Sequence, residues 1–184
     1  MTHSPRLAAD DWRRVLMRLA GALHGGSPAH MTVIGGAAIA LLFDARRTTT
    51  DVDVVIDSSD TMRVLAEARS IAAEFGLPEN WLNQDARTGG FIQEPLQLGQ
   101  TLIETPDLTV SAPTIEHLLA TKLPVARRGD TDIEDCLVLT RRLRATSDDA
   151  DDLWSRIGGL VPVAHRQNAL YNLRWIWEIL DERP

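Results

Sequence analysis

The stretch Val33–Asp57, VIGGAAIALLFDARRTTTDVDVVID, decides the fold of this chain. A short apolar run leads to a glycine pair, a second apolar run follows, and an alternating run then begins with two aspartates. This order predicts a strand, a tight turn, a short helix and another strand. Residues i and i+2 of a strand face the same side, so Asp51 and Asp53 are expected to project together. Two carboxylates that close repel each other unless a cation lies between them.

The glycine pair Gly35-Gly36 gives the aspartates a chemical context. Glycines between a strand and a helix let backbone amides approach a phosphate at the helix N-terminus. Mg²⁺ binds one or two carboxylates together with substrate phosphates. Each feature alone has an ordinary structural explanation, a plain tight turn for the glycines and an exposed strand end for the aspartates. Their order within one short stretch favours phosphates at one end and a metal at the other.

Apolar periodicity outside this stretch predicts an α+β fold. The segment 76–95 is rich in turn-forming residues and shows no clear period. We expect a small mixed β-sheet with helices and a helical C-terminal half, divided into an α/β core at 1–112 and a helical part at 113–184, or folded as one continuous domain. The expected elements are helices at 12–23, 37–43 and 62–75, strands at 31–34, 51–56, 100–105 and 107–112, and helices within 113–128, 131–143, 148–157 and 163–180.

The composition places the chain among cytoplasmic globular proteins. Of its 184 residues 44% are hydrophobic and 24% charged, which is ordinary for a domain with its own core. The single cysteine, Cys136, excludes an internal disulfide framework and fits a reducing compartment. No apolar run approaches the length of a membrane span, and the first residues lack the order of a signal peptide. The net charge of −7 argues against a basic coat for nucleic acid.

Lys122 is the only lysine among 19 lysines and arginines. Lysine carries a compact point charge, whereas arginine presents a wide planar fork, so a position that requires lysine does not tolerate arginine. Chance is the alternative explanation, because one basic position had to lie somewhere. The observation makes Lys122 a candidate for a specific charge contact.

Three stretches resemble a known family. The run GGAAIALLFDARRTTTDVDVVI resembles the signature of the polymerase-β-like nucleotidyltransferase superfamily, in which a Gly-Gly or Gly-Ser turn precedes a D-x-D strand. The chain is most similar to minimal nucleotidyltransferases related to the toxins of type IV abortive-infection systems. Further matches are GLPENWLN at 76–83 and LTVSAPTIEHLLATKLPVARRGDTDIEDCLVL at 108–139. The resemblance covers residues 30 to 140.

The resemblance implies a nucleotide site and a metal site. Asp51 and Asp53 would bind the catalytic Mg²⁺ or Mn²⁺. Full polymerase-like sites carry a third carboxylate on a later strand, for which Glu104 is the candidate, with Asp107 behind it. The residues that match the family's nucleotide-binding positions are Gly35, Gly36, Arg47, Thr49 and Lys122.

The resemblance also assigns roles in the C-terminal half. Lys122 matches the lysine of a toxin-like K-x-x-x-A segment and would contact the triphosphate or the acceptor. Asp132 and Asp135 match the D-x-x-D-x-x-x-L motif that follows. They are candidate catalytic residues that would assist deprotonation of the acceptor hydroxyl if no third carboxylate is present, and Asp130 competes with Asp132 for the motif position. Pro124 is expected to kink the helix just after Lys122, because proline removes a backbone donor.

The implied reaction is transfer of a nucleoside monophosphate from an NTP to a hydroxyl. By family analogy the acceptor is the 3′ end of a tRNA, which would make the chain a toxin with a cognate antitoxin protein. Two alternatives stay open. One is transfer to a protein or to a small molecule such as an aminoglycoside, and the other is a non-catalytic, nucleotidyltransferase-like binding module.

Overall fold

The computed structural model describes residues 5–43, 48–57, 59–127 and 131–182. The chain forms two compact units. The first comprises Met1–Asp85 and Leu98–Ala112, and the second comprises Ala86–Gln97 and Pro113–Pro184. The sequence suggested a division after residue 112, and the second unit does resume at Pro113. The segment 86–97, expected in the core, packs instead with the second unit.

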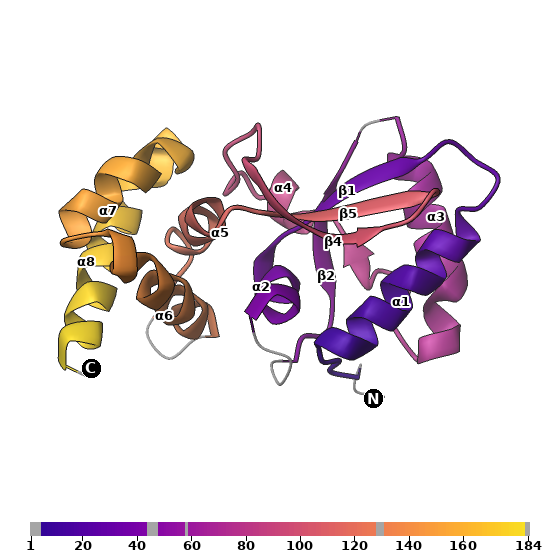
Figure 1. Ribbon diagram of the computed structural model, residues 1–184, viewed down its shortest axis with the longest axis horizontal. Coiled ribbons are helices and arrows are strands. Elements are labelled where there is room, and N and C mark those ends of the chain that lie inside the picture. Colours follow the sequence, from indigo (N-terminus) through magenta and orange to yellow (C-terminus); the bar gives the residue numbers. More distant parts are fainter. Residues whose placement is uncertain (1–4, 44–47, 58, 128–130, 183–184) are drawn as a thin grey trace. The chain divides into compact units, whose positions relative to one another are not determined.

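A five-stranded sheet forms the centre of the first unit, in the strand order β3-β2-β1-β5-β4 (Figure 1). β1 pairs antiparallel with β2 and parallel with β5, and β2 pairs parallel with β3. The sheet is therefore mixed, and the predicted α+β class is confirmed. The strands are β1 (Ala29–Val33), β2 (Val52–Ile56), β3 (Leu82–Asn83), β4 (Leu98–Glu104) and β5 (Leu108–Pro113).

Three helices pack beside this sheet, and α1 contacts both α2 and α3. The predicted helix at 62–75 changes geometry near its end, because α3 passes into a 3₁₀ turn that stops at Gly76. Gly76 adopts a φ of 65°, the left-handed conformation that commonly ends helices at glycine. The helical segments are α1 (Ala9–Ala22), α2 (Gly35–Phe43), α3 (Thr61–Ile71) and the 3₁₀ turn η1 (Ala72–Phe75).

A pair of tryptophans joins the helices to the sheet in the core of the first unit. Trp12 of α1 and Trp81 are fully buried and stack with ring centroids 5.7 Å apart. The Trp81 indole Nε1–H donates to the Ala68 carbonyl of α3 at 2.8 Å. Its backbone oxygen accepts from Val52 N at the start of β2, at 2.7 Å. Trp81 therefore connects α1, α3 and β2.

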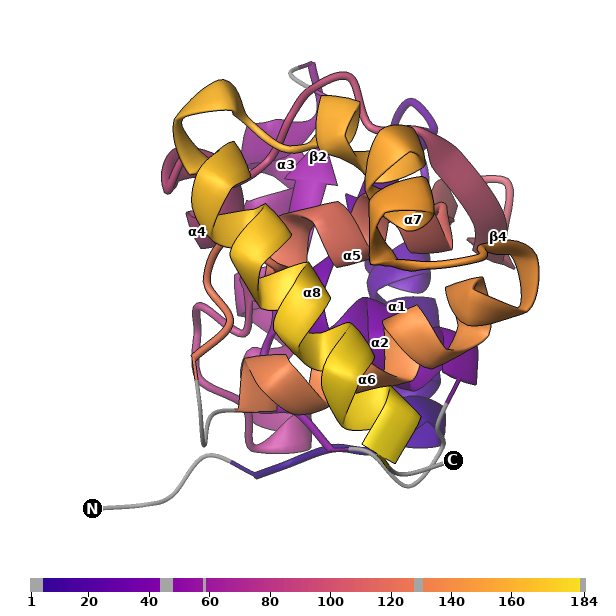
Figure 2. The ribbon, with the colours of Figure 1, turned by 90° about the vertical axis from the view of Figure 1, so that its left-hand side faces the viewer.

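The second unit is helical, as the sequence predicted for the C-terminal half. The long helix α8 runs beside α6 and α7 (Figure 2). α5 does not continue through a kink at Pro124. It ends at Lys122, and Pro124 lies in the turn that follows. The helical segments are α4 (Asp85–Thr88), α5 (Ile115–Lys122), α6 (Thr131–Leu143), η2 (Arg144–Thr146), α7 (Ala150–Ile157), η3 (Gly158–Leu160), η4 (Val163–His165) and α8 (Arg166–Glu182).

Within the described ranges, none of the helices is both long enough and apolar enough to cross a membrane.

Trp81→Ala is expected to lower the free energy of unfolding by about 3–5 kcal/mol, because it leaves a cavity against Trp12 and removes the hydrogen bond to Ala68. Urea unfolding measures the change. The matched control is Leu98→Ala, whose side chain is 62% exposed and whose loss should change stability by less than about 0.5 kcal/mol. Equal effects of the two substitutions would contradict the role assigned to Trp81.

Candidate functional site

The turn from β1 into α2 passes directly against an aspartate of the neighbouring strand. Gly35 has a φ of 65°, and a Cβ at this position would lie 3.2 Å from Oδ2 of Asp53. A Cβ at Gly36 would lie 3.9 Å from Oγ1 of Thr49. The left-handed φ and the close carboxylate together require glycine at position 35. The glycine pair thus lets the chain turn immediately beside Asp53 and Thr49.

Asp53 takes its place from the antiparallel pairing of β1 with β2. Val33 pairs with Val54, and the Ile34 N–H donates to the Asp53 carbonyl at 2.9 Å. Asp53 is half-buried, while Asp51 precedes the first residue of β2 and is exposed. The register of the two strands therefore carries Asp53 to the start of α2.

Thr49 links the glycine turn to Asp51. Its Oγ1 lies 3.2 Å from Oδ1 of Asp51 and 3.3 Å from the Asp51 carbonyl. Thr50 Oγ1 is a more distant donor to the same Oδ1, at 3.5 Å. Both hydroxyl contacts to the Asp51 carboxylate go to Oδ1, so they orient that group from one side.

The sheet face that carries Asp53 combines polar residues with one apolar residue of β2, Val55. Val52, Val54 and Ile56 of β2 are buried on the opposite face. The register places Asn83 of β3 and Thr32 of β1 on the Asp53 face, together with Ser111 of β5 one strand further, all half-buried. This face can accommodate a polar ligand.

Glu104 lies at the other end of the sheet. β5 runs parallel to β1, so the hairpin between β4 and β5 lies at the start of β1, where the Ala29 N–H donates to the Asp107 carbonyl at 3.0 Å. Asp53, in contrast, lies beside Ile34, just beyond the end of β1. The structure therefore does not bring Glu104 or Asp107 to the Asp51–Asp53 pair.

The donors at this pair suit a hard divalent cation. Asp51 and Asp53 offer carboxylate oxygens, and the glycine turn leaves the Asp53 carboxylate uncovered by a Cβ. In the part of the chain that the structure describes, no group of three or more His, Cys, Asp or Glu side chains could hold a metal ion. A Mg²⁺ ion at this pair would complete its coordination with phosphate and water oxygens, as Mg²⁺ commonly does.

Lys122 forms a buried charge cluster in the second unit. Its Nζ lies 2.6 Å from Oδ1 of Asp132 and 2.9 Å from Oδ2 of Asp135, both on α6. The side chain of Lys122 is 15% exposed and that of Asp135 only 2%. Three of the predicted site residues therefore form one ion-paired group.

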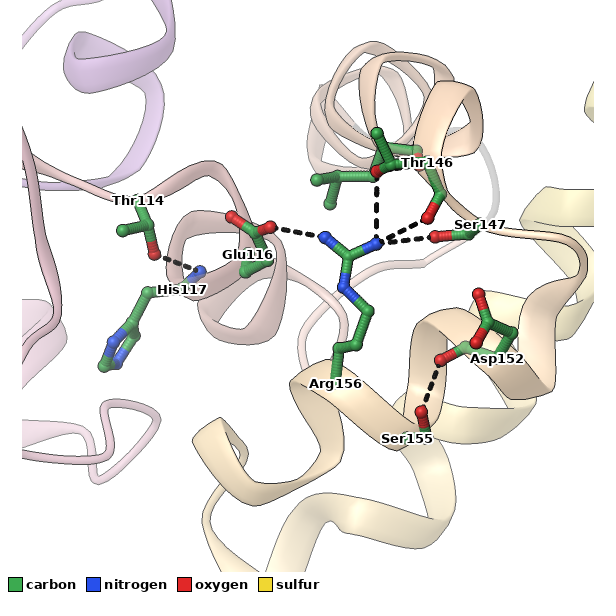
Figure 3. Close-up of polar contacts among 9 residues, drawn as sticks. Thr114, Glu116, His117, Thr146, Ser147, Asp152, Ser155 and Arg156 are labelled. Atoms are coloured by element: carbon green, nitrogen blue, oxygen red, sulfur yellow. Dashed lines mark hydrogen bonds and ion pairs between the residues drawn. The ribbon is translucent and has the colours of Figure 1, made fainter.

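Side chains from α7 and α8 hold α5 at both ends. Near its start, Arg156 of α7 donates to Glu116 at 2.7 Å and also to Thr146 and Ser147 (Figure 3). Beyond its end, the buried amide of Asn172 donates to the carbonyls of Leu123 and Ala126, at 2.8 and 3.1 Å. These bonds fix the helix that carries Lys122.

The surroundings of Lys122 alter two pKa values. Burial alone would lower the pKa of Lys122, but the charges of Asp135 and Asp132 and the hydrogen bonds to both outweigh burial, so the pKa is raised. The ammonium group therefore stays charged at neutral pH. Burial raises the pKa of the neighbouring Cys136 thiol far above its usual range. Cys136 is consequently a thiol and not a reactive thiolate.

His117 has a structural role in the second unit. Its Nδ1 accepts from Gln97 N at 3.0 Å, and its Nε2 lies 3.0 Å from the Gln93 carbonyl. This arrangement suits a neutral ring protonated at Nε2. Burial lowers the pKa of His117, although the hydrogen bond to Gln93 partly opposes the shift. The histidine thus holds the segment 86–97 on α5.

The structure brings the predicted residues together as two groups, one in each unit. The first group is Gly35, Gly36, Thr49, Asp51 and Asp53, and the second is Lys122, Asp132 and Asp135. Arg47 and Asp130 lie outside the described residues.

Sequence reasoning did not identify two features beside the first group. Asn83 pairs with Asp53 across β2 and β3. Its segment, WLN, stood out only as part of a resemblance, because a two-residue strand has no period. Leu7 pairs with Thr49 in an isolated β-bridge, and no local pattern predicts that contact.

Comparisons of the chain with protein-family models, with curated proteins and with solved structures returned no match. The interpretation of the site therefore rests on its geometry and on the motifs of the sequence.

Gly35→Ala is expected to lower the free energy of unfolding by about 1–2 kcal/mol, because alanine is strained at a φ of 65° and its Cβ would crowd Asp53. Thermal unfolding measures the loss. Gly21→Ala is the control. Gly21 lies in α1 with no atom within 4 Å of an added Cβ, so this substitution should stabilise the helix by about 0.5–1 kcal/mol. Effects of the same sign would contradict the strained turn.

Lys122→Met is expected to lower the free energy of unfolding by about 3–5 kcal/mol, because it leaves the Asp135 carboxylate buried without its cation. Chemical denaturation measures the loss, and adding Asp135→Leu to Lys122→Met should recover part of it. The control is Arg174→Met, which removes an exposed pair with Asp151 and should cost less than about 1 kcal/mol.

The pH dependence provides a second test of the cluster. Because the pKa of Lys122 is raised above its usual 10.5, the cluster contributes its full stability below pH 10.5 and loses it as the pH rises through the raised value. The Lys122→Met variant should lack this alkaline loss. An identical alkaline profile in wild type and variant would show that the cluster contributes nothing.

Proposed function

We propose that this chain is a Mg²⁺-dependent nucleotidyltransferase of the polymerase-β-like type, which moves a nucleoside monophosphate from an NTP to a hydroxyl acceptor. The observation that carries the proposal is the glycine turn at the N-terminus of α2 lying against the Asp53 carboxylate, 3.2 Å from the Cβ position of Gly35. A phosphate seat and a metal-binding carboxylate then lie side by side, as nucleotidyl transfer requires.

The neighbouring residues support this proposal. Asp51, two residues before Asp53, carries a second carboxylate oriented by Thr49. On the Asp53 face of the sheet, the adjacent strands carry the polar residues Asn83 and Thr32. A structural carboxylate at a surface turn needs none of these partners, whereas a substrate site uses all of them.

The reaction is an in-line displacement at phosphorus. The acceptor oxygen bonds to the α-phosphorus of the NTP while the bond to the bridging oxygen of the β-phosphate breaks, so pyrophosphate leaves and the hydroxyl proton passes to a base or to solvent. A divalent cation, when bound, neutralises the developing negative charge. Asp51 and Asp53 would hold that cation, and the amides of Gly35 and Gly36 would bind phosphate oxygens.

Lys122 is the cation that the resemblance assigns to the second unit. Its raised pKa keeps the ammonium group charged, and it uses two of its donors on Asp132 and Asp135. In this proposal the two carboxylates hold Lys122 in place.

The proposed acceptor is the 3′ end of a tRNA, and the proposed setting is the cytoplasm, where the chain would act as a toxin controlled by an antitoxin protein. This part rests on family analogy, through the toxin-like K-x-x-x-A segment that begins at Lys122 and the D-x-x-D-x-x-x-L motif that follows it. The net charge of −7 favours a second candidate, a cationic small molecule such as an aminoglycoside, because an acidic surface attracts it.

Incubation with each α-³²P-labelled NTP, Mg²⁺ and one acceptor class at a time tests the proposal. The acceptors are total tRNA, an aminoglycoside and the protein itself. Label on tRNA supports the toxin activity, and label on another acceptor selects the second class. The absence of label from every acceptor would overturn the proposal in favour of a non-catalytic binding module.

Asp53→Asn is the variant that connects the label to the site. It should reduce transfer by at least about 100-fold, because it removes a charged ligand of the cation. The matched control is Asp57→Asn, an exposed aspartate just beyond the far end of β2, which should leave transfer unchanged. Equal losses in the two variants would separate the activity from the proposed site.

A further inference from the structure

Residues 6 and 7 are bound to the segment that leads into Asp51. Leu7 and Thr49 exchange both backbone hydrogen bonds, Leu7 N to Thr49 O at 2.9 Å and Thr49 N to Leu7 O at 3.1 Å. Arg6 donates from Nε to Thr48 Oγ1 and from Nη2 to the Thr48 carbonyl, each at 3.2 Å. Arg6 and Leu7 therefore bind the consecutive threonines Thr48 and Thr49 through hydrogen bonds.

These hydrogen bonds hold the segment that orients the Asp51 carboxylate. Thr49, held through its backbone by Leu7, has its Oγ1 3.2 Å from Oδ1 of Asp51. Asp51 precedes β2 and is exposed, so the ladder between β1 and β2 does not include it. Asp53, by contrast, lies within β2, and its carbonyl accepts from Ile34 N. The two carboxylates are therefore positioned by different means.

Leu7 is joined through Ala8 to the buried part of the first unit. Ala8 follows Leu7, and its carbonyl accepts from the N–H of Trp12 at the start of α1. Trp12 is fully buried and stacks on Trp81, whose carbonyl in turn accepts from Val52 N, next to Asp51. The segment from Thr49 to Val52 is thus attached at both ends to the same buried tryptophan pair.

We propose that Leu7, acting through Thr49, is a positioning residue for Asp51 and determines how well the aspartate pair binds a divalent cation. The inference rests on the proposed function, since it assigns a metal to Asp51 and Asp53. The hydroxyl of Thr49 engages Oδ1 of Asp51, and the cation takes the remaining coordination capacity of that carboxylate. Partners of this kind orient a ligand before the metal arrives, and their loss commonly weakens affinity 10- to 100-fold.

Direct titration of the full chain with Mn²⁺, following free Mn²⁺ by electron paramagnetic resonance, tests the inference without any need for turnover. Leu7→Pro removes the N–H that donates to Thr49 and should weaken Mn²⁺ binding about 10-fold. Leu7→Ala keeps the backbone pair and should bind as wild type does. Unchanged affinity in a folded Leu7→Pro variant would overturn the proposal.

A second pair of variants covers the case in which Leu7→Pro does not fold. Thr49→Val removes the hydroxyl and should weaken Mn²⁺ binding about 10-fold, whereas Thr49→Ser keeps the hydroxyl and should restore it. In an Asp51→Asn background, Thr49→Val should have no further effect, because the carboxylate that it orients is gone. A merely structural threonine would instead lower the melting temperature and leave the Mn²⁺ affinity unchanged.

The outcomes separate the inference from the proposed function. Mn²⁺ binding that depends on Asp51, Thr49 and Leu7 without transfer of label would sustain the inference and overturn the enzymatic proposal. If label is transferred but Thr49→Val and Leu7→Pro leave the Mn²⁺ affinity unchanged, the enzymatic proposal is sustained and the inference is overturned. A wild-type chain that binds no Mn²⁺ would overturn the positioning role.

Discussion

The candidate site depends on the pairing of β1 with β2, which places the Asp53 carboxylate 3.2 Å from the Cβ position of Gly35. A residue with a side chain at position 35 would crowd this carboxylate. Because the pairing is antiparallel and α2 intervenes, the end of β1 and the start of β2 meet at the start of the helix. The glycine turn and the Asp53 carboxylate are consequently neighbours in space.

The cluster at Lys122 in the second unit contains a carboxylate that is more deeply buried than the aspartates of the candidate site. The Asp51 carboxylate is exposed and Asp53 is half-buried, whereas Asp135 is almost completely buried and depends on Lys122 for compensation. Such a cluster contributes little net stability over an apolar equivalent, yet losing one member is costly. Its value lies in holding a charged ammonium group at a defined place. The single lysine of the chain thus occupies a position where arginine, with its longer planar fork, would need a different cavity.

Local patterns predicted the elements well and their long-range partners poorly. The α+β class and the helical C-terminal half followed from periodicity, which the backbone imposes within a few residues. Glu104 is the carboxylate of a later predicted strand, 100–105, and for that reason matched the family's third carboxylate. A strand's place and direction in the sheet depend on pairings far away in the sequence, and these put Glu104 at the opposite end. β3 and the Leu7–Thr49 bridge are too short to leave a periodic signal.

The sequence by itself determined the order of the parts: a glycine pair, a short helix and then two aspartates with one residue between them. This order determines which groups are available, namely backbone amides at a helix start and carboxylates on a strand, because the glycines precede a helix and alternate strand residues share a side. Only the tertiary structure decided which aspartate lies against the glycine turn and which strand borders that aspartate. It also decided which residues bind the segment that leads into Asp51. Those answers depend on strand register and on the packing of Trp12 against Trp81, and both are settled by burial across the whole unit.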